Sequence, residues 1–218
     1  MSARTAAWAA ARTRWPVRLA DGDVGLRPLR RRDQATWLAL RAENAAWLDP
    51  WDATSPLPAG PTPTFWQYVR SLNAQARSGQ ALPFAVTYRG ELVGQLTVSS
   101  ITYGSLCSAS VGYWVSRHVA GRGIIPTGVA LATDYCFGTL GLHRIEINIR
   151  PENEPSLRVV AKLGLRDEGV RERYLHIQGH WADHRTFAVT TEDVPQGLLA
   201  RWHATQAAGR PEGSVHGS

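Results

Sequence analysis

The order of apolar and polar residues predicts a strand and then two helices in the first third of the chain. Residues 24–29 alternate between apolar and polar side chains, which is typical of a half-buried strand. Apolar residues then recur at helical spacing after Asp33, a favourable N-cap, and this helix is expected to end near Ala46. Residues 50–63 contain five prolines and predict an irregular loop, and the second helix is expected to end near Gly79.

The rest of the chain predicts an antiparallel meander and then alternating helices and strands. Residues 82–88, 91–101 and 108–116 are rich in strand-forming residues, and an Arg-Gly turn separates the first two. Gly121-Arg122-Gly123 then precedes an apolar helical pattern that continues to Cys136. The last predicted elements are a strand at 144–149, a helix at 156–163 and a strand pair at 166–177 and 181–190.

Length and composition agree with one compact domain. A chain of 218 residues with 44% hydrophobic residues and nine tryptophans can bury a substantial core, which excludes wholesale disorder. The longest weakly polar run, residues 124–142, is broken by Pro126 and Asp134, so no lipid-spanning helix is expected. The two cysteines, Cys107 and Cys136, cannot form a disulfide framework, which fits a reducing cytoplasm.

The positive charge of the chain is concentrated at its N-terminus. The formal net charge is +6, and residues 1–32 carry eight arginines and two aspartates, so the rest is neutral. The arginines can bind an acidic surface such as RNA, and the alternative is a frayed terminus. We therefore expect an Arg-rich arm (1–19), a folded domain (20–193) and a C-terminal extension (194–218) whose end is disordered.

The run from His118 to Gly123, between a predicted strand and a predicted helix, is the most informative for chemistry. Its glycines allow backbone N–H groups to point into one concavity, and the helix N-terminus adds positive dipole character, so a pyrophosphate can bind there. A dinucleotide-binding fingerprint would need glycine at position 126, where this chain has Pro126. The remaining alternative is that the glycines only turn the chain.

Four segments together resemble the GNAT acetyltransferases in order and spacing. They are Gly112-Tyr113-Trp114-Val115, Ala120-Gly121-Arg122-Gly123-Ile124, Arg144-Ile145-Glu146 and residues 151–165. Within that superfamily, residues 47–51 and 179–184 resemble the RimJ/RimL group, which acetylates the N-terminal amines of ribosomal proteins. The resemblance covers about residues 20–192. It implies a mixed α/β fold, with a twisted sheet of six or seven strands, helices on both faces and a splayed central strand pair.

The resemblance also implies that acetyl-CoA is the acetyl donor. Backbone N–H groups of residues 121–124 would hold its pyrophosphate, and Val115 would offer a backbone N–H to the thioester carbonyl. Asn153 would bond the cofactor, and it can equally serve as a helix N-cap. The residues expected to contact the cofactor are Trp114, Val115, Arg117, Gly121, Arg122, Gly123, Ile124, Asn153 and Ser156. No metal is expected, because Asp183-His184 lacks a third ligand at metal-site spacing.

Acetyl transfer to an amine requires a base for the amine and an acid for the departing thiolate. The resemblance places the Ser156 hydroxyl near the CoA sulfur as the acid, and the alternative is an ordinary first-turn serine. No Ser-His-Asp or Cys-His arrangement is apparent, so direct attack within a ternary complex is expected. Glu146 is favoured as the base, and a water relay to a remote carboxylate is an alternative. The other candidate bases are Glu172, His176 and Asp183.

The acceptor is expected beside the proline-rich loop, where family members place it. The residues expected to contact it are Asn44, Trp47, Trp51, Glu172 and His176, although the tryptophans can instead belong to the core. The preferred acceptor is the N-terminal α-amine of a protein, of the ribosomal-protein-alanine type. The alternatives are a small-molecule amine acetyltransferase and a non-catalytic CoA-binding module that its arm tethers to RNA or the ribosome. The protein is expected to be cytoplasmic, without a membrane partner, and a monomer or homodimer.

Overall fold

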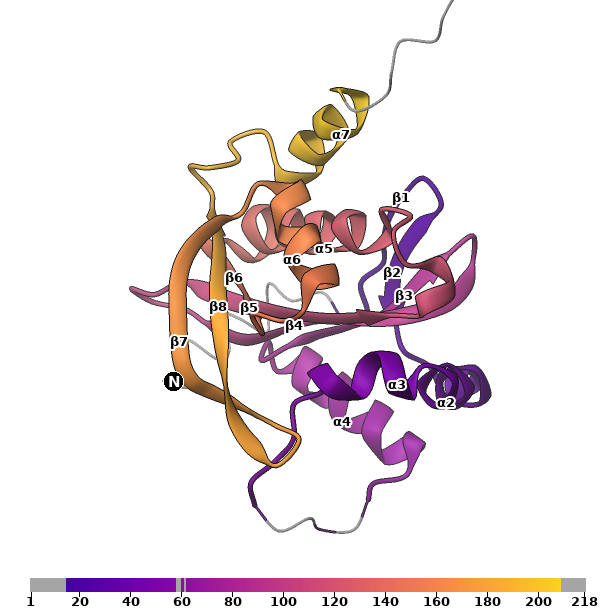
Figure 1. The fold of residues 1–218 in the computed structure, drawn as a ribbon. Coiled ribbons are helices and arrows are strands. Elements are labelled where there is room, and N and C mark those ends of the chain that lie inside the picture. The colour runs from indigo at the N-terminus through magenta and orange to yellow at the C-terminus, as the bar shows by residue number, and fades with distance from the viewer. Residues whose placement is uncertain (1–14, 58–59, 61, 209–218) are drawn as a thin grey trace, which may run out of the picture.

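One mixed β-sheet with helices on both faces forms the structure, a computed structural model that describes residues 15–57, 60 and 62–208 (Figure 1). The strand order is β1-β2-β3-β4-β5-β6-β8-β7. The strands are β1 (Leu19–Asp21), β2 (Val24–Pro28), β3 (Leu82–Tyr88), β4 (Glu91–Thr102), β5 (Ser108–Val115), β6 (Arg144–Ile149), β7 (Arg166–Ile177) and β8 (His180–Thr190). The mixed α/β fold is confirmed, but the sheet has eight strands rather than six or seven, because β1 is too short to show an alternating pattern.

The helices form one layer on each face of the sheet (Figure 1). On one face lie α2 (Gln34–Glu43), α3 (Ala45–Leu48) and α4 (Phe65–Arg77), with the short helices η1 (Arg31–Asp33) and η2 (Asp49–Trp51) flanking them in sequence. On the other face lie α5 (Ile124–Tyr135), α6 (Glu154–Leu163) and α7 (Leu198–Ala208). The segments η3 (Arg117–Val119) and η4 (Cys136–Leu140) flank α5.

Helix α5 is the most deeply buried helix of the second layer. Every residue from Ile124 to Thr133 is buried, which explains why its sequence is apolar on nearly all sides. Helix α7, which the sequence does not predict, packs on α5. Its first N–H groups, of Leu198 and Leu199, donate to the Asp134 carboxylate of α5 at 2.6 and 3.1 Å, so a charged cap from a distant residue starts this helix.

The two central strands separate along their length. Strands β5 and β6 run parallel, and they pair only where Ser108–Ser110 face Arg144–Glu146. Beyond these residues β5 continues to pair with β4 as far as Val115, and β6 continues to pair with β8 as far as Ile149. The splayed central pair that the sequence predicts is therefore confirmed, and one wedge-shaped opening divides the sheet.

Two sequence predictions concern segments that the structure does not describe. Residues 1–14, most of the Arg-rich arm, and residues 209–218, the end of the C-terminal extension, lie outside the described residues. The domain boundaries at residues 19 and 193 therefore stay predictions. Within the described part of the chain, no helix is long and apolar enough to cross a membrane.

Candidate active site

A cavity of about 750 Å³ occupies the opening between β5 and β6. Residues of β5, β6, the glycine loop and the start of α6 form its walls on one side of the sheet, and residues from α2 to η2 form them on the other. This volume is within the range of small-molecule and cofactor sites. The splay thus creates a continuous site that is reached from both helical layers.

The glycine loop lines this cavity in front of α5. Gly121 and Gly123 have φ values of +84° and +79°, and both line the cavity together with Ala120 and Ile124. A Cβ built on Gly121 would meet no atom within 4 Å, so the left-handed backbone rather than crowding inside the protein favours glycine there. The loop leads into the N-terminus of a helix, whose first N–H groups have no partner within the helix.

Positive side chains reach the cavity from α6 rather than from the loop. Arg158 and Lys162 line it, four residues apart and therefore on one face of the helix. Arg117 and Arg122, which the sequence predicts as cofactor contacts, are not among the described lining residues, and the Arg117 guanidinium lies 5.8 Å from the centre of the Trp47 ring. In the sequence, the i, i+4 spacing of Arg158 and Lys162 is the signal that could have identified α6 as the source of positive charge.

The backbone of Val115 faces the opening. The N–H of Ser116 donates to the carbonyl of Val93 in β4 at 2.8 Å. Successive residues of a strand direct their backbone groups to opposite sides, so Val115 directs its N–H and C=O away from β4. Its carbonyl accepts a hydrogen bond from Trp47 Nε1 at 3.1 Å. The Val115 N–H therefore points toward the opening, while its role as a donor to a thioester stays a prediction.

The start of α6 brings the Ser156 hydroxyl to the cavity, where Tyr113 of β5 contributes a second one. Asn153 is the N-cap of this helix, and its Oδ1 accepts from the Ser156 backbone N–H at 3.2 Å. Ser156 lines the cavity next to Tyr113 of β5. Burial raises the pKa of the Tyr113 phenol, and the hydroxyl of Ser156 opposes part of this increase. Asn153 therefore has the capping role, while its contact with a cofactor stays a prediction.

Aromatic and charged residues line the cavity on the side of α2 and η2. Trp47 and Trp51 are both lining residues, as the sequence predicts for acceptor contacts. Arg150, the residue after β6, holds η2 in place. Its Nη1 donates to the Pro50 carbonyl at 3.2 Å, and its guanidinium lies 5.8 Å from the centre of the Trp51 ring. On this same side the carboxylate of Asp52, which follows η2, is ion-paired with Arg41 of α2.

Three other predicted acceptor contacts do not line the cavity. Asn44 is buried and joins the end of α2 to the turn after β5, because its Nδ2 donates to Ser116 Oγ at 2.9 Å and its Oδ1 accepts from the Arg117 N–H at 2.8 Å. His176 Nδ1 lies 2.7 Å from Thr54 Oγ1 and so connects β7 to the segment after η2. Glu172 is exposed on β7. These residues support the walls or point to solvent.

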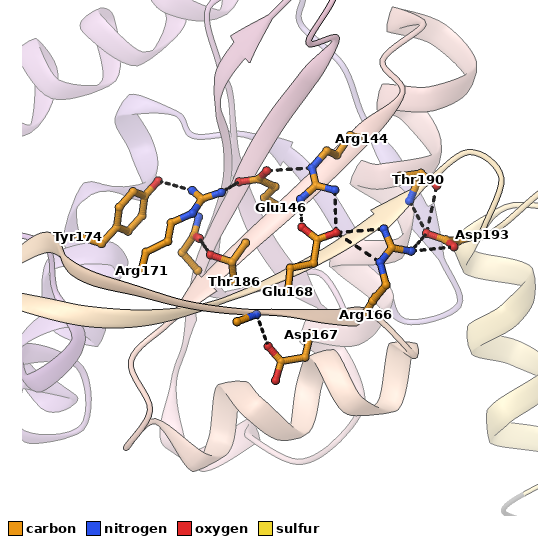
Figure 2. Close-up of polar contacts among 12 residues, drawn as sticks. Arg144, Glu146, Arg166, Asp167, Glu168, Arg171, Tyr174, Thr186, Thr190 and Asp193 are labelled. Atoms are coloured by element: carbon orange, nitrogen blue, oxygen red, sulfur yellow. Dashed lines mark hydrogen bonds and ion pairs between the residues drawn. The ribbon is translucent and has the colours of Figure 1, made fainter.

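The carboxylate favoured as the base lies outside the cavity lining. Glu146 accepts from Arg144 Nε at 2.9 Å and from Arg171 Nη2 at 3.0 Å, within a network of charges that joins β6 to β7 (Figure 2). Arg144 also binds Glu168, whose pKa falls to about 2 mainly because of this hydrogen bond. Asp183 is also outside the lining, and it accepts from the Arg173 N–H at 2.7 Å. The structure therefore places neither carboxylate in the lining of the cavity.

The sequence interpretation did not identify a polar cluster on the acceptor wall. Gln95 of β4 is buried, its Oε1 accepts from Trp37 Nε1 at 3.1 Å, and its Nε2 donates to the Tyr68 hydroxyl at 2.8 Å. All three side chains line the cavity, and burial raises the pKa of Tyr68. His184 lines the cavity as well. A glutamine in the apolar run of β4 is the signal that could have revealed this wall.

This site has the features of an acyl-CoA-dependent transferase. The glycine loop and the cations of α6 fit the phosphates of CoA, the opening between β5 and β6 fits its pantetheine arm, and the far side leaves space for an acceptor. Within the described residues, no group of three or more His, Cys, Asp or Glu side chains could hold a metal ion.

Comparisons with known proteins identify the family. The sequence model of the acetyltransferase (GNAT) domain matches residues 23–166. The [ribosomal protein uS5]-alanine N-acetyltransferase of Escherichia coli is 30% identical over 188 residues, which cover 83% of this chain and 94% of that protein. The "Probable N-acetyltransferase YjcK" of Bacillus subtilis is 37% identical over 105 residues, covering 48% of this chain and 58% of that protein.

Comparison with a solved structure identifies the same family. RimJ of Mycobacterium smegmatis, in complex with a CoA disulfide, has a TM-score of 0.79 and 39% identity, covering 88% of this chain and 96% of that one. The chain belongs to the GNAT acetyltransferase family. It is an acetyl-CoA-dependent N-acetyltransferase, as the sequence predicts.

Proposed function

We propose that the acceptor is the N-terminal α-amine of a protein, and that this protein is a ribosomal protein beginning with alanine. The observation that carries the proposal is the similarity to the uS5-alanine N-acetyltransferase of Escherichia coli, which extends over 94% of that protein and so includes the acceptor side as well as the cofactor side. The similarity to Mycobacterium smegmatis RimJ, at 39% identity, supports the same group.

The charge of the cavity supports a protein N-terminus over a polycationic small molecule. Asp52 is the one acidic side chain among the described residues that line the cavity, and it is already paired with Arg41. A polyamine or an aminoglycoside carries several positive charges and needs several carboxylates in its site. A peptide presents one amine followed by a neutral backbone, which the aromatic wall of Trp47 and Trp51 can accommodate.

Two peptides test this proposal directly. One begins with a free alanine and contains an internal lysine, and its control is the same peptide with a blocked N-terminus. We expect mass spectrometry to find one acetyl group on the α-amine of the first peptide and none on the control. Acetylation of the lysine in both peptides, or turnover of a polyamine in preference to the free peptide, would contradict the proposal.

We also propose that the enzyme acts in the cytoplasm as a monomer or homodimer, and that its Arg-rich arm contacts ribosomal RNA. The arm contains four arginines, Arg4, Arg12, Arg14 and Arg18, whereas residues 33–218 carry equal numbers of basic and acidic side chains, and this contrast supports the RNA contact. Ribosome co-sedimentation over a salt series, with and without residues 1–14, measures it. Equal association of both forms at every salt concentration would indicate that the arm has no such role.

A further inference from the structure

His184 occupies a buried position on the acceptor side of the cavity. It belongs to β8, where Ala182, His184 and Thr186 alternate with more exposed residues, and only 3% of its surface is exposed. It lines the cavity. Arg150, which contacts η2, is close enough to lower the pKa of its imidazole. The imidazole therefore lies on the wall that faces the acceptor, whereas Ser156 belongs to the opposite helical layer.

One hydrogen bond determines the tautomer of this ring. His184 Nδ1 lies 3.0 Å from the carbonyl oxygen of Ala182. A carbonyl oxygen only accepts, so Nδ1 carries the hydrogen atom. In the neutral ring, Nε2 then has a free lone pair. An oriented imidazole with an unprotonated Nε2 is the form that a general base requires.

The surroundings keep the ring neutral near pH 7. Burial lowers the pKa of His184 below its ordinary value, and the positive charge of Arg150 lowers it further. The hydrogen bond to Ala182 and the carboxylates of Asp183 and Glu152 oppose this decrease without cancelling it. The titratable groups near the ring, on its own strand and on neighbouring segments, are Arg150, Glu152, Arg171, Tyr174 and Asp183.

The other candidate bases are already engaged or lie elsewhere. Among the described lining residues Asp52 is the one carboxylate, and Arg41 neutralises it. Glu146 is held by two arginines outside the cavity (Figure 2). His184 is also the one histidine among the described lining residues. The cavity thus contains a neutral imidazole and no uncommitted carboxylate.

We propose that His184 Nε2 is the general base that removes a proton from the acceptor ammonium group. The free amine then attacks the thioester carbonyl, the C–N bond forms and the C–S bond breaks. The attacking nitrogen then loses a second proton and the departing thiolate gains one, so CoA leaves as the thiol. The imidazolium releases the first proton to solvent. The products are the acetylated amine, CoA thiol and one proton. This inference rests on acetyl transfer to an amine and not on the identity of that amine.

The kinetic test compares His184→Gln with His143→Gln, a substitution of an exposed histidine paired with Glu192. We expect His184→Gln to lower kcat/KM for the acceptor by about 100-fold at pH 7 and to leave the Kd of acetyl-CoA unchanged. The acid limb of the unaltered enzyme should have its midpoint below pH ~6.5, and the variant's limb should move toward the amine's own pKa near ~8. His143→Gln should keep the original profile.

The choice of acceptor keeps this test separate from the proposed function. The kinetics use whichever amine gives turnover, from peptides to small primary amines, so failure of every peptide would overturn only the protein acceptor. An unchanged kcat/KM and pH profile in folded His184→Gln would overturn the role of His184.

A second readout needs neither turnover nor a variant that is active. In the full chain with ¹⁵N-labelled histidine, we expect the His184 signals at pH 7 to show a protonated Nδ1 and an unprotonated Nε2. The titration midpoint should lie below the ordinary value of ~6.5. The signals are assigned by their loss in His184→Gln, or by through-bond connectivity if that variant does not fold. A protonated Nε2 at pH 7 would overturn the proposal.

Discussion

Replacing Ser156 by alanine is expected to lower kcat by about 100-fold or more and to leave the Kd of acetyl-CoA nearly unchanged. The departing thiolate develops charge in a partly closed cavity, and a hydroxyl that donates to this charge acts in the transition state and little in the ground state. Ser156 lines the cavity at the start of α6, beside the buried Tyr113 phenol. Steady-state kinetics and calorimetry of Ser156→Ala measure both quantities.

The local structure separates this chemical role from a structural one. Asn153 caps α6 through the backbone N–H of Ser156, a contact that Ser156→Ala retains. The variant should therefore keep its melting temperature. Asn153→Ala removes the cap and should cost about 1 kcal/mol of stability. A folded Ser156→Ala enzyme with unchanged kcat would remove this hydroxyl from the mechanism.

Substituting Gly94 by alanine is expected to destabilise the protein by about 1–3 kcal/mol and to reduce turnover by about 100-fold. A Cβ at this position would lie 2.2 Å from the Trp114 carbonyl oxygen and 3.0 Å from Val115 Cα. These are backbone atoms, so β4 and β5 must move apart at the residue whose N–H faces the opening. Thermal unfolding and kcat are the measurements.

The matched control is Gly138→Ala, where a Cβ would meet no atom within 4 Å. That variant should resemble the unaltered enzyme in both melting temperature and kcat. If Gly94→Ala behaved in the same way, the strand pair would tolerate the side chain, and the precise placement of Val115 would not matter for catalysis.

The sequence predicts the scaffold of the site better than its chemistry. The glycine loop and the first turn of α6 are short continuous segments, and the resemblance to the GNAT acetyltransferases implied the splayed strands. The structure joins all three around one cavity. The face on which Glu146 lies is also a local property. Its partner Arg171 is on a strand 25 residues later, so alternation within β6 could not show that the carboxylate is engaged.

Long-range contacts also explain the other omissions. Helix α7 receives its cap from Asp134, 64 residues before Leu198, and a sequence pattern around the helix contains no such signal. In the sequence, His184 next to Asp183 resembles part of a metal site that lacks a third ligand, and nothing in this local pattern indicates a base. Its burial, its tautomer and its place in the cavity depend on the packing of β6 and β7 against β8.

Hydrogen exchange of the full chain with and without acetyl-CoA tests most directly whether the splayed strands and the glycine loop hold the donor. Bound acetyl-CoA would remove solvent from the backbone N–H groups that face the opening and the loop. We predict slower exchange in residues 111–115 and 120–125, and unchanged exchange in the exposed start of β7, residues 166–170. Binding of acetyl-CoA without protection of either segment, or with protection confined to another surface, would contradict this account.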